Sequence, residues 1–341
     1  MANERSVTIE DVARAASVSR QTVSNVLNSP AIVRPDTRDR VRAAIARLGY
    51  APHASARRLR TRRSSTIGIH LDPYAGGISG AVLDRFVHAL TERAGERGLR
   101  VLVYAAASPE EEIQRMTDLA DGGEVDGIVI TGTRYGDPRI AWLTARGLPF
   151  VSFGRPWGDD DIDDPLHLWV YVDGAAGTRE ATEHARAAAG PRVAFLGWPA
   201  GSGTGDDRER GWREAMRAAV VSEADLGELR LTVAESVADA RAATTALLQR
   251  DAVDAIVCVS DSLAVGAHVA AVGAQRPDLL VVGFDNTPAA EALGLSSIEQ
   301  LPEQVAAGTL DLLTVGGSLI GNRALEAGQA HVLVRPRLVV R

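Results

Sequence analysis

Residues 7–28 read VTIEDVARAASVSRQTVSNVLN, and the organisation of the rest of the chain follows from this stretch. Thr8, with Asp11 three residues later, predicts a capping box that opens a helix. Apolar residues then recur at helical spacing as far as Ala16. Ser17 to Ser19 leave room only for a tight turn before the next periodic segment. The stretch therefore predicts one short helix, a turn and the start of a second helix.

Ser19 predicts the N-cap of that second helix, whose buried stripe we expect to be Val23, Val26 and Leu27. Away from the stripe the helix carries short or planar polar side chains, namely Arg20, Gln21, Thr22, Ser24, Asn25 and Asn28. Such groups hydrogen-bond base edges and phosphates in a major groove, and Thr8 and Ser19 join them as candidate DNA contacts. The pattern predicts a helix-turn-helix unit, although a helical hairpin with a solvated polar face has the same pattern.

A third helix is predicted from Pro35 to Leu48, with Gly49 as its stop. Residues 51–63 follow, and they are rich in Arg with one apolar residue, Leu59, among them. Taken alone this segment is a basic linker, but a short basic helix with an apolar wedge is also what minor-groove insertion requires. The candidate DNA contacts of this hinge are His53, Ala56 and Leu59.

Charge is divided unevenly along the 341 residues. Residues 1–63 hold 13 Arg and 5 acidic residues, a balance of +8, whereas residues 64–341 carry −15, which together give the net charge of −7. A basic head on an acidic body favours a nucleic-acid-binding module joined to a domain that avoids DNA. The chain has no apolar run of membrane-spanning length and no secretory signal pattern, so we expect a cytoplasmic protein without membrane contact.

The body has the rhythm of an α/β fold. Apolar runs of strand length recur at Thr66–His70, Leu99–Tyr104, Gly127–Thr131, Pro149–Phe153, Leu168–Val172, Arg192–Gly197, Glu228–Val233, Ala255–Val259 and Leu279–Phe284. Helical segments lie between them, for example near 79–97, 109–121 and 137–146. This alternation predicts parallel sheets, interrupted by a loop at Gly154–Pro165.

Several separate stretches resemble the lactose-repressor (LacI/GalR) family of bacterial transcriptional regulators. They are Val7–Asn28, Tyr50–Pro52, the Arg-flanked Leu59, Asp206–Trp212 and Val281–Asn286. The resemblance implies that the second helix enters the major groove of operator DNA. It also implies that the hinge helix pairs with its twin in the minor groove, with Leu59 intercalating, so the protein is expected to be a homodimer or tetramer. Ser17 and Asn25 depart from the Gly and Arg common in the family.

The same resemblance implies a body of two doubly wound parallel-sheet subdomains, similar to periplasmic binding proteins, behind the all-α helix-turn-helix domain. The expected divisions are a DNA-binding domain 1–50, a hinge 51–63 and an effector-binding and dimerisation domain 64–341, split into an N-subdomain of 64–165 plus 298–329 and a C-subdomain of 166–297 plus 330–341.

Candidate effector contacts follow from where the strands end, because open parallel sheets bind ligands at the carboxyl ends of their strands. Arg208 and Asp285 match family positions that hold a sugar or nucleobase, and Arg forks and carboxylates suit bonding to vicinal hydroxyls. A salt bridge is the alternative for this pair. The second-rank candidates are Asp72, Tyr74, Trp198 and Asp261. For Trp198, packing under its loop is nearly as good an explanation.

Catalytic and metal-binding patterns have little support. Gly201–Gly205 lacks the Lys of a phosphate loop and is better explained as a flexible turn. The acidic run 159–164 lacks EF-hand spacing, and Cys258 lies in an apolar strand. We therefore expect no metal, no cofactor and no enzyme activity, but a repressor released from its operator by a small neutral sugar. The alternatives are a soluble sugar-binding transport protein and an α/β sugar-metabolising enzyme, such as a kinase or ribohydrolase.

Overall fold

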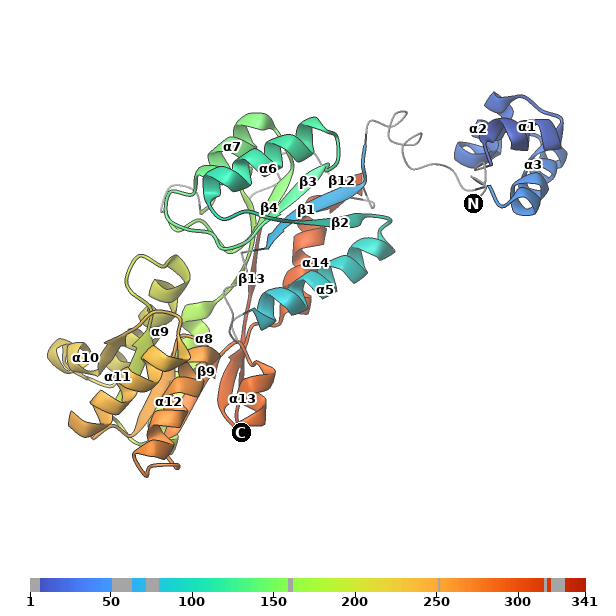
Figure 1. Ribbon diagram of the computed structural model, residues 1–341. Coiled ribbons are helices and arrows are strands. Elements are labelled where there is room, and N and C mark those ends of the chain that lie inside the picture. Colours follow the sequence, from blue (N-terminus) through green and yellow to red (C-terminus); the bar gives the residue numbers. More distant parts are fainter. Residues whose placement is uncertain are drawn as a thin grey trace. The chain divides into compact units, whose positions relative to one another are not determined.

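The computed structural model describes residues 7–50, 63–71, 80–158, 162–250, 252–315, 318–319 and 329–341 (Figure 1). The chain forms two compact units, a small one up to Ser64 and a large one from Ser65. None of the helices in these ranges is long and apolar enough to span a membrane.

The small unit is a three-helix module with a short 3-10 turn. Its elements are α1 (Ile9–Ala16), α2 (Arg20–Asn28), η1 (Pro30–Ile32) and α3 (Pro35–Leu48). Val12, Val23 and Val41, one from each α-helix, are the centre of its core. The predicted helices are confirmed, but Leu27 is 36% exposed and is not part of the buried stripe. It lies at the edge of the stripe, because Val23 and Val26 already point at the other two helices.

The large unit contains two six-stranded sheets with the same winding. The first sheet is all parallel, in the order β13 (His331–Val334), β5 (Leu168–Val172), β4 (Phe150–Phe153), β3 (Gly127–Ile130), β1 (Thr66–Leu71) and β2 (Arg100–Ala105). Its helices are α5 (Ala81–Glu96) and α14 (Pro302–Leu313) on one face and α6 (Pro109–Asp121) and α7 (Pro138–Arg146) on the other (Figure 1). We call this sheet with its helices the first lobe.

The second sheet runs in the order β14 (Arg337–Val339), β10 (Ser296–Glu299), β9 (Leu280–Phe284), β8 (Ala255–Cys258), β6 (Val193–Gly197) and β7 (Arg230–Thr232). Only β14 is antiparallel to its neighbour among these pairs. The helices of this second lobe are α8 (Gly174–Ala189), α9 (Gly203–Ala218), α10 (Glu223–Leu229), α11 (Val237–Arg250), α12 (Asp261–Gly273) and α13 (Pro288–Ala292). A small hairpin, β11 (Thr314–Val315) with β12 (Ser318–Leu319), follows α14.

The chain crosses between the lobes three times, and each crossing differs from the predicted position. β5 belongs to the first sheet, so the first crossing is at Asp173 and not near 165. β10 lies wholly in the second sheet, which moves the second crossing from 297 to 300–301. β13 pairs with β5 before β14 joins the second sheet, which moves the third from 330 to 335–336. An apolar extended segment has the same pattern in either sheet, and only its hydrogen-bonding partner decides which sheet it joins.

The turn between α1 and α2 leads to a test of stability. Ser17 adopts φ 52°, a left-handed conformation, and its N–H bonds to carbonyls at the end of α1. A side chain in this conformation costs about 1 kcal/mol relative to glycine. We therefore expect Ser17→Gly to raise the free energy of unfolding of the small unit by up to about 1 kcal/mol, as measured by chemical denaturation. A Gly at Ser29, whose φ is −147°, should destabilise instead.

Candidate functional site

A cap hydrogen bond and an ion pair fix the start of α2. The Ser19 Oγ accepts the Thr22 N–H at 3.1 Å, which makes Ser19 the N-cap as predicted. Arg20 Nη1 donates to Glu10 Oε1 on α1 at 2.8 Å, across the turn. Both side chains of this ion pair are more than half exposed, so it orients Arg20 and adds little stability.

Two amide side chains further along α2 form a connected pair. Gln21 Nε2 donates to Asn25 Oδ1 at 3.0 Å, one helical turn apart. The Asn25 amide nitrogen and the Gln21 oxygen then remain available on an exposed face. Asn28 instead turns back and donates to the Ser24 carbonyl at 2.7 Å. Of the predicted DNA contacts with amide side chains, Gln21 and Asn25 therefore face outward, whereas Asn28 bonds to the backbone of its own helix.

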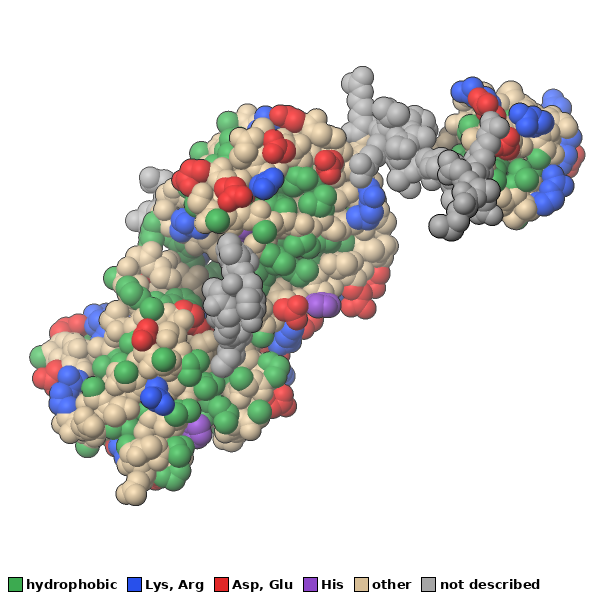
Figure 2. Space-filling model, in the orientation of Figure 1, with side chains coloured by type: hydrophobic (Ala, Val, Ile, Leu, Met, Phe, Trp, Pro, Cys, Tyr) green, Lys and Arg blue, Asp and Glu red, His purple; other side chains and the backbone are tan. Residues whose placement is uncertain are grey.

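The small unit also carries the capping box that the sequence predicted. Thr8 Oγ1 and Thr8 N both donate to Asp11, at 2.7 and 3.0 Å. Through these bonds Thr8 fixes the start of α1. Arg side chains lie at several places on this unit, interspersed with a few acidic ones (Figure 2). His53, Ala56 and Leu59, the predicted hinge contacts, lie outside the described residues.

In the large unit, Arg208 occupies the switch point of the second sheet, where β6 and β8 are neighbours but their connections diverge. It is on α9, only 5% exposed, and its Nη1 donates to the Val259 carbonyl at 2.6 Å. The guanidinium lies 3.6 Å from the centre of the Phe284 ring. Its buried Nε has no hydrogen-bond partner among the described atoms, so one donor of the fork is unsatisfied.

Asp285 faces this arginine from the end of β9. The distance from Arg208 Nη1 to Asp285 Oδ1 is 3.8 Å, and the same oxygen accepts the Gln300 amide at 2.6 Å. The backbone of Asp285 is at φ 115°, which is strained for a residue with a side chain and is a feature of functional sites. Burial raises the pKa of Asp285 to about 7; the charge of Asp261 adds to the rise and Arg208 opposes it.

Trp198 closes another side of the same region. Its ring centre is 5.8 Å from the Arg208 guanidinium, and its Nε1 donates to Glu235 Oε2 at 2.6 Å. Glu235 also accepts from Ser260 Oγ at 2.8 Å. Glu235 and Gln300 therefore orient two predicted site residues, although the sequence analysis did not select them. Each follows a strand end, which was the available signal.

Asp261 has structural partners within the second lobe. It is fully buried, and its two oxygens accept the Thr287 N–H and the Ser297 hydroxyl, each at 2.6 Å. Both acceptors are therefore occupied by the segments on either side of α13. Asp261 therefore holds the loop that carries Asp285, and its predicted ligand contact stays a prediction. A carboxylate directly after a strand can hold a loop, contact a ligand or do both.

Of the remaining predictions, two residues cannot be placed, one segment differs from the structure and one residue agrees with it. Asp72 and Tyr74 lie outside the described residues. Gly201–Gly205 is not a flexible turn as expected, because Ser202 caps α9 and Gly203 begins it. The reason is close packing: a Cβ at Gly203 would overlap the Trp157 ring. Cys258 is buried in β8 as predicted.

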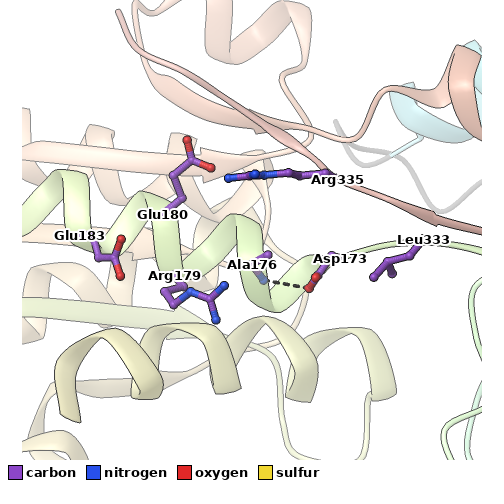
Figure 3. Close-up of a pocket in the computed structure, with 7 residues that line it drawn as sticks. All are labelled: Asp173, Ala176, Arg179, Glu180, Glu183, Leu333 and Arg335. Carbon is purple, nitrogen blue, oxygen red and sulfur yellow. Dashed lines mark hydrogen bonds between the residues drawn. The ribbon is translucent and has the colours of Figure 1, made fainter. Parts of the chain in front are cut away.

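Two hollows lie away from these residues. One, of about 540 Å³, is beside the start of α8, where Arg335 points across toward Glu180 and Asp173 caps the helix through Ala176 (Figure 3). The other, of about 670 Å³, lies beside α7 and includes Trp157 and His167. Arg208, Asp285 and Trp198 line neither, so the candidate pocket is defined by their contacts.

Two family models match the chain: residues 8–53 match the bacterial regulatory proteins of the lacI family, and residues 80–305 match the periplasmic binding proteins and sugar binding domain of the LacI family. This chain is a LacI-family protein. The HTH-type transcriptional regulator CelR of Thermobifida fusca is 32% identical over 85% of each chain. A LacI-family regulatory protein from Chloroflexus aggregans has a TM-score of 0.72 at 31% identity, covering 82% of this chain and 98% of its own.

A further solved structure, a transcriptional regulator CelR–cellobiose complex, has a TM-score of 0.69 at 26% identity and covers 98% of this chain and 99% of its own. Membership of the LacI family makes the chain a DNA-binding transcriptional regulator. Its relatives are regulators and not enzymes, in agreement with the prediction. The predicted α/β body behind a helix-turn-helix domain is confirmed.

The raised pKa of Asp285 predicts how stability depends on pH. A carboxyl whose pKa is about 7 when folded and near 4 when unfolded contributes stability below pH 4 and loses it as the pH rises through 7. Asn does not titrate, so Asp285→Asn should remove this pH-dependent loss, which is on the order of 2–4 kcal/mol of the free energy of unfolding. The stability of the variant relative to the wild type should therefore increase between pH 4 and 7. Thermal melts over that range measure it, with the exposed Asp278→Asn as control. Parallel pH profiles for all three proteins would contradict the assignment.

Proposed function

We propose that this LacI-family regulator is a cytoplasmic, homodimeric repressor of carbohydrate-utilisation genes, released from its operator when a neutral sugar binds beside Arg208 and Asp285. The single observation that carries the proposal is this buried pair at the carboxyl edge of the second sheet. The two groups face each other at 3.8 Å, too far for a close hydrogen-bonded ion pair, and each keeps other partners.

The chemistry of the pair favours a neutral polyhydroxyl ligand. The ionised form of Asp285 repels an anion and Arg208 repels a cation, whereas vicinal hydroxyls can hydrogen-bond to the Asp285 carboxyl group and accept from the unsatisfied Arg208 Nε. Trp198 adds an aromatic face, fixed by Glu235, on which the apolar side of a sugar ring can stack. The CelR structure similar to this chain is a complex with cellobiose, which makes cellobiose the first sugar to test.

The DNA-binding side of the proposal rests on the outer face of α2. Ser19, Arg20, Gln21, Thr22, Ser24 and Asn25 are exposed or partly exposed there, with Arg20 and the two amides already oriented. A symmetric dimer presents two such helices and requires a pseudo-palindromic operator with two half-sites. The Arg-rich hinge with Leu59 would add minor-groove contacts and a bend.

The effector pocket is tested by Arg208→Ala. Operator duplexes are first selected from a random library with the full-length protein, and release by cellobiose is then followed by fluorescence anisotropy. The variant should bind the operator as the wild type does but lose the response to sugar, because the contacts of the guanidinium with Val259 and Phe284 lie in the second lobe, away from the DNA-binding unit's sequence. In thermal-shift experiments a sugar at 100 times its Kd stabilises the wild type by about 2.7 kcal/mol, and this gain should vanish.

Arg213→Ala is the matched control, since Arg213 is on the same helix but pairs with Glu209. It should leave the sugar response intact. If Arg208→Ala still released DNA at the wild-type cellobiose concentration, the pocket would be elsewhere. If a panel of neutral sugars produced no thermal shift in the wild type, the proposed ligand class would be wrong.

Base readout is tested by comparing Asn25→Ala with Asn28→Ala. The Asn25 amide faces outward, so its loss should cost about 1–3 kcal/mol of discrimination at one base pair in each half-site. The Asn28 amide bonds the Ser24 carbonyl, so its loss should weaken all duplexes to a similar degree. Binding is measured against a set of singly substituted operators at fixed salt. Uniform weakening by Asn25→Ala would assign that residue to backbone positioning.

A further inference from the structure

One face of α9 carries a stripe of residues spaced one helical turn apart, Gly203, Asp207 and Gly211. The two glycines allow close approach: a Cβ at Gly203 would overlap the Trp157 ring, and one at Gly211 would overlap the Ala175 carbonyl. Asp207, between them, is the one charged member of the stripe. The next residue, Arg208, is part of the candidate pocket. Helix α9 therefore carries a packing face and an effector contact at adjacent positions.

The carboxylate of Asp207 is almost completely buried, and donors from both lobes reach it. From the first lobe, the Tyr171 hydroxyl donates to Oδ2 at 2.6 Å and Arg155 Nη2 donates to Oδ1 at 3.0 Å. From the second lobe, the Ala175 N–H donates to Oδ2 at 3.0 Å and Arg210 Nη2 to Oδ1 at 2.6 Å. Because α8 begins at Gly174, the carboxylate also lies at the positive end of that helix.

The first-lobe partners are themselves held in position. The Arg155 guanidinium packs against two rings, 4.9 Å from the centre of Trp157 and 5.2 Å from that of Tyr171. Those rings are in edge contact at 5.3 Å. Burial and the nearby charge of Asp207 raise the pKa of Tyr171 well above its ordinary value, so its hydroxyl remains a donor. The first-lobe partners of Asp207 are therefore also in contact with one another.

The first lobe also contacts the N-terminal end of α9 through the loops after β3 and β4. Trp157 donates its Nε1 hydrogen to the Thr133 carbonyl at 3.1 Å, which ties the loop after β4 to the loop after β3. Tyr135 in that second loop interacts with Asp206 of α9; burial raises the pKa of Tyr135, and Asp206 contributes to the rise. The loops at the carboxyl ends of β3 and β4 thus rest on the first two turns of α9.

We propose that Asp207 is a positioning residue for effector binding: its carboxylate, held by Arg155 and Tyr171, keeps α9 against the first lobe in the arrangement in which Arg208 binds the sugar. The link to the sugar rests on the proposed function, whereas the link between the lobes does not. Opening the lobes would separate Asp207 from two of its four donors and leave a buried charge less compensated. The contact therefore favours the closed arrangement, and ligand binding and lobe closure are coupled through it.

Lobe separation is measured without ligand by double electron–electron resonance on the full-length protein. Nitroxides are attached to cysteines introduced at Ala141 on α7 and Ala238 on α11, which are both exposed, while Cys258 is buried and stays unlabelled. Arg155→Gln and Asp207→Asn should each broaden and lengthen the distance distribution. Arg210→Gln removes a bond to the same carboxylate from within the second lobe and should not. Wild-type distributions for Arg155→Gln and Asp207→Asn, or an equal change in Arg210→Gln, would overturn the proposal.

Cellobiose affinity, measured by isothermal titration calorimetry, tests the coupling. Arg155→Gln and Asp207→Asn should each raise the Kd about tenfold, and the double variant should be no weaker than either single one, because both remove the same contact. Arg155→Lys, which keeps the charge, should recover part of the affinity. Additive losses, or an unchanged Kd with opened lobes, would show a structural role only. If the wild type does not bind cellobiose, the resonance result still decides whether Asp207 joins the lobes, and the proposed ligand alone fails.

Discussion

The large unit depends on a constraint of connectivity, which is that the chain passes between its two sheets three times. The crossings at Asp173, 300–301 and 335–336 make both lobes discontinuous in sequence, since β5 and β13 complete the first sheet while β10 and β14 complete the second. Neither lobe can therefore form from one continuous stretch of chain. The lobes are joined by short segments only, so small rotations between them are the motion that this topology permits.

The crossings also determine which side chains meet. Gln300 lies at the second crossing and donates to Asp285, so a residue of the connection contacts the candidate pocket directly. Asp207 lies against the start of α8, immediately after the first crossing, and receives Tyr171 from the last strand before it. Polar contacts thus join the second crossing to Asp285 and the first crossing to Asp207.

The buried charges of this network explain why α9 has an unusual composition for a packed helix. Its glycines admit Trp157 and the α8 backbone, while Asp207 and Arg208 are buried with named partners on each side. Buried ion pairs contribute little net stability compared with apolar packing, but they specify one arrangement because a displaced charge is costly. Such a helix therefore specifies one position of α9 against its neighbours. The apolar contacts of Trp212 and Phe195 anchor its other face.

The sequence by itself determined the three helices of the small unit and the strand–helix alternation of the body, because capping residues and periodicity are local signals. Thr8 and Ser19 were placed by such signals, whereas Arg208 and Asp285 were selected by strand ends together with the family resemblance, and their ligand role stays a prediction. Tertiary structure alone decided the sheet to which β5 and β13 belong, the structural role of Asp261 and the position of Asp207 between the lobes. The reason is the same in each case: hydrogen-bond partners and burial depend on residues far away in the chain. A local stretch of sequence does not show which distant residues it will contact.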